Sequence, residues 1–271
     1  MNDVLILIQA RMNSTRLPKK IMLSVCGKPL LYRMYERVSR SRYANNVAII
    51  TSTRKDDDSI EKFCISEGII YYRGHATDLL DRHYKAAKKL KGKIIVKIPS
   101  DCPLIDPKII DRVIGYYLDD APYYDYVSNL HPASYPDGND VEVMSFDALE
   151  KAWICSNKSY EREHTTPFIW ENPNLFKIGN VTCSDGNDYS FTHRWTLDYE
   201  EDYILIRAVY QELYYKNPLF GLDDILDLIE KKPHLKKINE KHIGKYWYIN
   251  HLDELKNIND FRTKYVQVIN G

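Results

Sequence analysis

A cluster of basic and hydroxyl side chains follows directly on the first apolar segment of the chain. Residues 4–8 are apolar, and the next positions contain Arg11, Ser14, Arg16 and Lys20. Cations this close together repel one another unless an anion binds among them. One guanidinium group can bind two phosphate oxygens at once, a lysine ammonium group adds a point charge, and a serine hydroxyl donates a hydrogen bond. Such a loop after a buried strand predicts a nucleotide-binding site; the alternative is a solvated loop that is basic without a ligand.

Two common phosphate-binding motifs do not occur in the sequence. The chain has no GxxxxGK[ST] segment, so it is not a P-loop protein. It also has no GxGxxG segment, which argues against a dehydrogenase.

Three aspartates follow apolar segments at positions where they could bind a metal or cap a helix. Asp101 comes just after residues 94–98, in a stretch stiffened by three prolines, and lies too far upstream to cap the next helix. A rigid carboxylate beside a phosphate site is well placed to bind Mg²⁺. Asp106 directly precedes Pro107 and is expected to be a helix cap. For Asp198, after residues 195–197, the residues alone leave an N-cap and a metal ligand equally open.

Strands and helices alternate in the first half of the chain, and they must position these side chains. The apolar runs are 4–8, 47–51, 69–72 and 94–98, and the helical stripes between them are 30–38, 60–64 and 79–87. Strands that are apolar on both faces predict a mostly parallel sheet covered by helices. Because ligands bind beyond the carboxyl ends of such strands, the residues after Ile8 and Ile98 are expected to face one crevice.

The second half is less regular. Helices are predicted over 107–117, 146–155 and 200–215, and strands over 126–129, 141–144, 176–181 and 195–197. Helical stripes at 222–229 and 252–258 follow. We expect a main domain over 1–217 and a helical extension over 218–271, packed on that domain or on a second subunit.

Composition excludes several functional classes. The 38 basic and 38 acidic side chains balance, which argues against nucleic acid as a partner. The five cysteines are scattered, with no CxxC pair, so free thiols in a reducing, cytoplasmic compartment are expected and a structural zinc is not. The first apolar run is far shorter than the about 18 residues of a membrane span, and no signal peptide is recognisable.

Several motifs together resemble one enzyme family. The segments QARMNSTRLPKK (9–20) and GKPLLYR (27–33) are similar to the start of the sugar cytidylyltransferases, which include the CMP-KDO and CMP-sialic acid synthetases. Further motifs resemble the spore-coat polysaccharide branch called SpsF: LDRHY (80–84), SDCPLIDP (100–107), YPDGNDVEV (135–143), REHTTP (162–167) and WTLD (195–198).

The resemblance implies a fold and an activity. The fold is the nucleotide-diphospho-sugar transferase type, a three-layer Rossmann-like α/β architecture with a mixed, mostly parallel sheet. The activity is transfer of CMP from CTP to a sugar acid or a phosphorylated acceptor, with release of pyrophosphate, for surface polysaccharide or glycoconjugate biosynthesis. The implied cofactor is Mg²⁺ held by Asp101 and Asp198, although the acidic run 198–202 departs from the pattern of many acid-sugar synthetases and leaves open which acid completes the site. A homodimer is also expected.

The resemblance also assigns site residues. Arg11, Arg16 and Lys20 are expected to stabilise the departing pyrophosphate. The expected nucleotide-binding residues are Gln9, Ala10, Arg11, Ser14, Arg16, Lys20, Asp81 and Arg82. The expected acceptor-binding residues are Tyr135, Asp137, Asp140, Glu142, Arg162, His164 and Arg194.

Four alternatives stay open at this point. Arg162 could instead form an ion pair with Glu161 or Glu163, and His164 could be a core histidine. The whole chain could be a glycosyltransferase of the same fold that consumes a nucleotide sugar, or a catalytically silent subunit that binds one.

Overall fold

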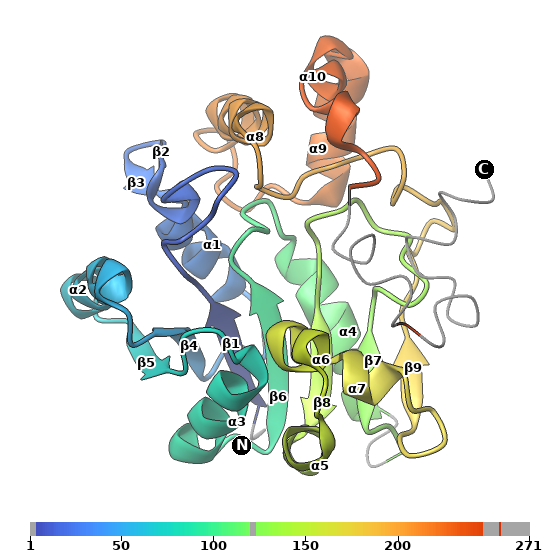
Figure 1. Cartoon of the computed structure of the whole chain (residues 1–271). Helices are drawn as coiled ribbons and strands as arrows, with labels where there is room; N and C mark the ends of the chain where they lie inside the picture. Colours follow the sequence, from blue (N-terminus) through green and yellow to red (C-terminus); the bar gives the residue numbers. More distant parts are fainter. Residues whose placement is uncertain (1–3, 120–122, 246–254, 256–271) are drawn as a thin grey trace.

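The computed structural model describes residues 4–119, 123–245 and 255. Within these residues seven strands form one mixed sheet in the order β5-β4-β1-β6-β8-β7-β9 (Figure 1). Strands β5, β4, β1 and β6 are parallel, β8 is antiparallel to both β6 and β7, and β9 is parallel to β7. The strand bounds are Val4–Gln9 (β1), Val47–Ser52 (β4), Ile70–Gly74 (β5), Ile94–Pro99 (β6), Tyr126–Ser128 (β7), Glu142–Ser145 (β8) and Ile178–Asn180 (β9).

Helices cover both faces of the sheet, as the two-sided apolar strands predicted. On one face, α1 (Leu30–Val38), α2 (Asp58–Glu67) and α4 (Pro107–Asp119) bury their apolar stripes against Ile6, Ile8 and Val96. On the other face, α3 (Leu79–Leu90), α5 (Phe146–Cys155), α6 (Ser159–His164) and α7 (Pro167–Trp170) pack on Leu7 and Ile95. The three-layer architecture is therefore confirmed.

One predicted strand is wrong. Residues 195–197 form no strand. Arg194, directly before them, forms an isolated bridge with Asp137. The reason is that the backbone of residues 195–197 bonds to two different loops: Trp195 N–H donates to Asp137 O at 2.7 Å and Leu197 N–H to Asp101 O at 2.8 Å. Because the segment lies between these two loops, it has no neighbouring strand with which to pair.

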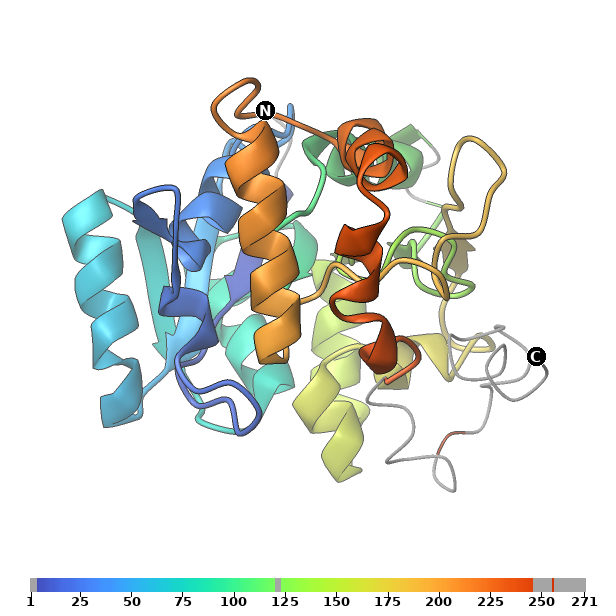
Figure 2. The same cartoon turned by 90° about the horizontal axis from the view of Figure 1, so that it is seen from above.

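The last described helices gather at the edge of the sheet where β1 and β6 finish (Figures 1 and 2). They are α8 (Glu200–Leu213), α9 (Leu222–Lys231), α10 (His234–Lys237) and the 3-10 turn η3 (Glu240–His242). A separate core cluster joins α8 and α9 to Leu30 and Trp195. The predicted stripe 252–258 lies outside the described residues except for Leu255, and the division at residue 217 stays a prediction.

Asp106 is a cap, as predicted, and it serves two helices. Its Oδ1 accepts from the N–H of Lys108 in α4 at 2.8 Å, and its Oδ2 accepts from the N–H of Leu222 at the start of α9 at 2.7 Å. The carboxylate therefore joins the C-terminal helices to the body of the fold.

The five cysteines are free thiols, as predicted. No described helix combines the length and apolar character that crossing a membrane would require.

Candidate active site

A cavity of about 720 Å³ opens beyond the carboxyl ends of β1 and β6. The two strands are in register there, with Ile8 opposite Ile98 and Gln9 opposite Pro99. Residues that follow both strands line this one cavity, so the predicted shared crevice is confirmed. Its volume lies within the range of small-molecule sites, about 300–1,000 Å³.

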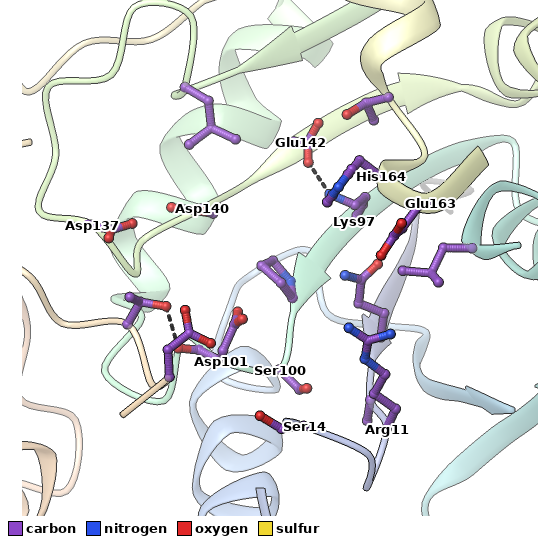
Figure 3. A pocket seen from close by; sticks show the side chains of 18 of the residues that line it. Arg11, Ser14, Lys97, Ser100, Asp101, Asp137, Asp140, Glu142, Glu163 and His164 are labelled. Atoms are coloured by element: carbon purple, nitrogen blue, oxygen red, sulfur yellow. Dashed lines mark hydrogen bonds and ion pairs between the residues drawn. The ribbon is translucent and has the colours of Figure 1, made fainter. Parts of the chain in front are cut away.

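The basic loop after β1 lies along the cavity. Arg11, Ser14, Arg16 and Lys20 all line it, and Figure 3 shows Arg11 and Ser14 on the loop. The start of the loop is fixed by Asp57, whose Oδ1 accepts from the Met12 N–H at 2.7 Å.

Asp57 was not predicted from the sequence. Its other oxygen accepts a hydrogen bond from Ser52 at the end of β4, so a buried carboxylate ties the loop to the neighbouring strand. Asp57 lies in an acidic run at the N-cap position of α2, where the sequence would suggest a helix cap, but its side chain makes no capping bond to α2.

The ammonium group of Lys20 brings Asp101 and Asp198 together. Lys20 Nζ lies 3.4 Å from Asp101 Oδ2, 2.8 Å from Asp198 Oδ1 and 2.6 Å from the Leu197 carbonyl oxygen. Arg16 also contacts Asp198, at 2.9 Å. The cations after the first strand and the carboxylates of two later segments therefore meet at one point.

These contacts control the ionisation of the site. Burial alone would raise the pKa of Asp198, but the adjacent Lys20 and Arg16 outweigh it and hold that pKa below its ordinary value. Burial likewise opposes the charge of Lys20, yet Asp101 and Asp198 raise its pKa. Asp198 and Lys20 therefore both stay charged at neutral pH.

The N-cap interpretation of Asp198 is wrong. Asp202, in the first turn of α8, instead accepts from the backbone N–H groups of Asp198 and Tyr199, each at 2.9 Å. The carboxylate of Asp198 is turned to the cavity.

Asp101 and Asp198 fit a cation site. Both touch one ammonium group, so both could hold one divalent ion. Among the described residues no three acidic, histidine or cysteine side chains form a complete metal cage. Mg²⁺ commonly binds through one or two carboxylates and completes its shell with water and substrate phosphates, which suits this pair.

Arg194 lines the cavity, but acidic side chains of the protein hold its guanidinium group. It contacts Asp202 at 3.0 and 3.1 Å, Asp137 at 3.1 Å and Asp198 at 3.5 Å, and it is buried. Burial opposes its charge, yet these carboxylates raise its pKa. This geometry makes Arg194 a support for Asp198, and a direct contact with the acceptor stays a prediction.

A buried ion pair lines another part of the cavity. Lys97 of β6 contacts Glu142 of β8, and Figure 3 shows the pair beside His164 and Glu163. Tyr126 donates to the second oxygen of Glu142 at 2.7 Å. Burial opposes the ionisation of Glu142, but Lys97 lowers the pKa of that carboxyl.

Lys97 was missed from the sequence, although a lone lysine inside an apolar strand was a usable signal. An unpaired buried lysine is costly, so its presence in such a strand indicates a partner carboxylate or a ligand.

Three predicted site residues do not line the cavity. Arg162 pairs with Asp78 at 2.6 Å, a different partner from the two considered from the sequence. Asp81 accepts from Trp153 Nε1 at 3.0 Å, and the buried Tyr135 donates to the Thr182 carbonyl at 3.3 Å. These residues hold the walls together through α3, α6 and the loop before β8.

The other predicted residues do line the cavity. They are Gln9, Ala10, Arg11, Ser14, Arg16, Lys20, Arg82, Asp101, Asp137, Asp140, Glu142, His164, Arg194 and Asp198. His164 is half-buried at the cavity wall, so its interpretation as a core histidine is wrong. Arg82 donates to the carbonyls of His75 and Ala76, and burial lowers its pKa to about 10.

Comparison with known sequences decides the family. A sequence model described as cytidylyltransferase matches residues 5–237. The chain belongs to the cytidylyltransferase family. This cytidylyltransferase is similar to the spore coat polysaccharide biosynthesis protein SpsF of Bacillus subtilis, with 31% identity over 238 residues that cover 86% of this chain and 96% of SpsF.

Two further relatives agree. A cytidylyltransferase structure from Leptospira borgpetersenii superposes with a TM-score of 0.82 and 34% identity, covering 87% of this chain and 97% of that one. The 3-deoxy-manno-octulosonate cytidylyltransferase of Chloroherpeton thalassium is 33% identical over 116 residues, 43% of this chain and 46% of that protein. The cytidylyltransferase is therefore a nucleotidyltransferase, and the fold and family implied by its motifs are confirmed.

Proposed function

We propose that this cytidylyltransferase moves CMP from CTP to a sugar acid or a phosphorylated acceptor, depends on Mg²⁺, and releases pyrophosphate. The observation that carries the proposal is the meeting of Arg16, Lys20, Asp101 and Asp198 in one cavity beyond β1 and β6. The similarity to SpsF suggests that the product serves the synthesis of a surface polysaccharide.

The reaction defines what these side chains must do. An acceptor oxygen forms a bond to the α-phosphorus of CTP, the bond from that phosphorus to the bridging oxygen breaks, and the acceptor proton is released to the solvent or a base. Negative charge builds on the departing pyrophosphate. Arg11, Arg16 and Lys20 would bind and orient the triphosphate and stabilise that charge; Arg16 and Lys20 are already held in place by Asp198.

Asp101 and Asp198 would hold Mg²⁺. When bound, the ion would neutralise phosphate charge and polarise the phosphorus that is attacked. Lys20 contacts both carboxylates and so holds them at one point, where a divalent cation could bind both.

The part of the cavity around Lys97 and Glu142 would receive the acceptor. This pair offers a donor and an acceptor of hydrogen bonds on a rigid sheet. His131 and Trp170 also line the cavity, with their rings tilted by 34° and their centroids 4.6 Å apart. Paired donors and acceptors beside an aromatic wall suit a hydroxyl-rich ring that carries an acidic group.

The direct test measures pyrophosphate release. The purified protein is incubated with Mg²⁺, each of the four nucleoside triphosphates in turn, and a panel of sugar acids and sugar phosphates, and the products are identified by mass spectrometry. The expected result is release with CTP and a suitable acceptor, and none when the metal is chelated. Transfer from a ready-made CMP- or UDP-sugar would indicate a glycosyltransferase instead, and binding of CTP without turnover with any acceptor would indicate a silent subunit.

A further inference from the structure

The segment after α10 returns to the cavity, although it lies beyond the part of the chain that the family model matches. That match ends at residue 237. Residues 240–242 form η3, and Lys245 lines the cavity together with Arg16 and Asp198. The C-terminal segment thus brings a basic side chain to a site otherwise built from the family domain.

Aromatic stacking holds this segment against the site. The ring of His242 stacks on that of Tyr199, with centroids 3.8 Å apart and an interplanar angle of 2°. The Nε2 atom of His242 lies 3.0 Å from a carboxylate oxygen of Glu201 in the first turn of α8. Tyr199 directly follows Asp198, so the tail is fixed to the segment that carries the predicted metal ligand.

Three cationic side chains surround the Tyr199 ring. Lys245 Nζ is 5.4 Å from the ring centroid, Arg16 Cζ is 5.5 Å away and Arg194 Cζ is 5.8 Å away. Arg16 and Arg194 also contact carboxylates, whereas the polar contact of Lys245 Nζ is with His242 Nδ1 at 3.2 Å. Within residues 4–119, 123–245 and 255, no carboxylate pairs with this ammonium group, which therefore adds positive charge to the cavity that Arg16 also lines.

We propose that Lys245, on the segment after α10, is part of the phosphate subsite. This subsite binds the β- and γ-phosphates of the nucleotide and the released pyrophosphate. The proposal rests on the proposed function only for the identity of the nucleotide. The exposed ammonium group of Lys245 lines the same cavity as Arg16 and would attract a polyphosphate. Because His242 already stacks on Tyr199, less entropy would be lost when this segment becomes ordered around the bound phosphates.

The test uses pyrophosphate itself, because its binding requires no acceptor. Its affinity for the full-length protein is measured by isothermal titration calorimetry with the wild type, Lys245→Met, Lys245→Arg and Lys237→Met. Lys237 is an exposed lysine of α10 that does not line the cavity, so it is the matched control for a lost tail charge. Melting by circular dichroism checks that each variant is folded.

Lys245→Met is expected to weaken pyrophosphate binding about tenfold, which corresponds to about 1.4 kcal/mol. Lys245→Arg should stay within about twofold of the wild type, as should Lys237→Met. Equal affinities of Lys245→Met and the wild type would overturn the proposal, as would an equal loss in Lys237→Met or no pyrophosphate binding by the wild type. The proposed function fails separately: pyrophosphate would bind through Lys245 while no triphosphate supported transfer.

Discussion

At the scale of single residues, the part of the cavity around Lys20 depends on opposite charges that compensate one another. Lys20 lies between Asp101 and Asp198, and Arg16 contacts the second of these. Two carboxylates that share a site repel each other, and the ammonium group between them offsets this repulsion. The neighbouring cations also hold the pKa of Asp198 below its ordinary value, so this carboxylate stays ionised at neutral pH.

Asp101→Asn tests the metal role. The amide keeps the shape of the side chain but removes the charge that Mg²⁺ prefers, so Mg²⁺-dependent turnover should fall at least about a hundredfold. The midpoint of urea unfolding should change little, because Asp101 is a half-buried cavity residue with a long contact to Lys20. Initial rates over a range of Mg²⁺ concentrations provide the measurement. Unchanged turnover would contradict the metal assignment.

Asp57→Ala tests the residue that anchors the basic loop. The substitution leaves the Met12 N–H and the Ser52 hydroxyl without their acceptor, so unfolding free energy should drop by about 1–3 kcal/mol. The loop should also lose its fixed position, so CTP binding by calorimetry should weaken.

Asp56→Ala is the matched control, since Asp56 is the exposed neighbour in the same acidic run. If Asp56→Ala weakened CTP binding as much as Asp57→Ala, the anchoring role would be wrong.

At the scale of elements, the contacts that shape the cavity join segments far apart in sequence. Lys97 and Glu142 connect the antiparallel neighbours β6 and β8, and Asp106 caps both α4 and α9. In each contact a carboxylate binds specific partners on a distant segment of the chain. The elements are therefore held in a single relative arrangement at the edge where the ligand would bind.

Lys97→Met should cost about 3–5 kcal/mol of unfolding free energy, because it leaves the buried Glu142 carboxylate without its counter-ion. The double variant Lys97→Met/Glu142→Leu should recover most of that loss, since it leaves no unpaired charge. Urea unfolding at neutral pH gives both values. A double variant no more stable than the single one would show that the pair is not the source of the loss.

The same pair predicts a pH dependence. The folded state lowers the pKa of Glu142 below its ordinary value of about 4.5. Its stabilising contribution is therefore present above that ordinary value and is lost as the pH falls through the lower pKa of the folded protein. Unfolding free energies from pH 7 down to pH 3 should fall less steeply for the double variant than for the wild type, and parallel curves would contradict this.

At the scale of the whole molecule, the C-terminal helices pack on the body of the fold, at the edge of the sheet that carries the site, through a core cluster shared with Leu30 and Trp195 (Figure 1). They complete the cavity from outside the sheet, because Tyr199 and Lys245 come from this part of the chain. The homodimer expected from the sequence stays a prediction. Light scattering during size-exclusion chromatography would check it by measuring the molar mass of the protein.

Ile225→Ala tests the docking of α9. Ile225 is fully buried between α8 and α9, so the variant should lose about 2–5 kcal/mol of unfolding free energy. Ile204→Ala on α8 is the control: this side chain is 38% exposed, and the loss should stay near 0.5 kcal/mol, as is usual for surface positions. Equal losses in the two variants would show that α9 is not docked through this cluster.

The sequence alone predicted the features that depend on residues close together along the chain. The apolar runs and stripes predicted the first four strands of the sheet and the helices between them, and the basic loop indicated a cavity at the end of β1. Periodicity and charge clustering are local properties, so they can be recognised before the fold is known.

Only the tertiary structure decided which side chains meet. It paired Met12 with Asp57, Lys97 with Glu142 and Arg162 with Asp78, and it turned the predicted strand at 195–197 into a wedge between two loops. It also brought Lys245 back to the cavity. Each of these contacts joins positions distant in sequence, and their choice depends on how whole layers pack, a property that no local pattern contains.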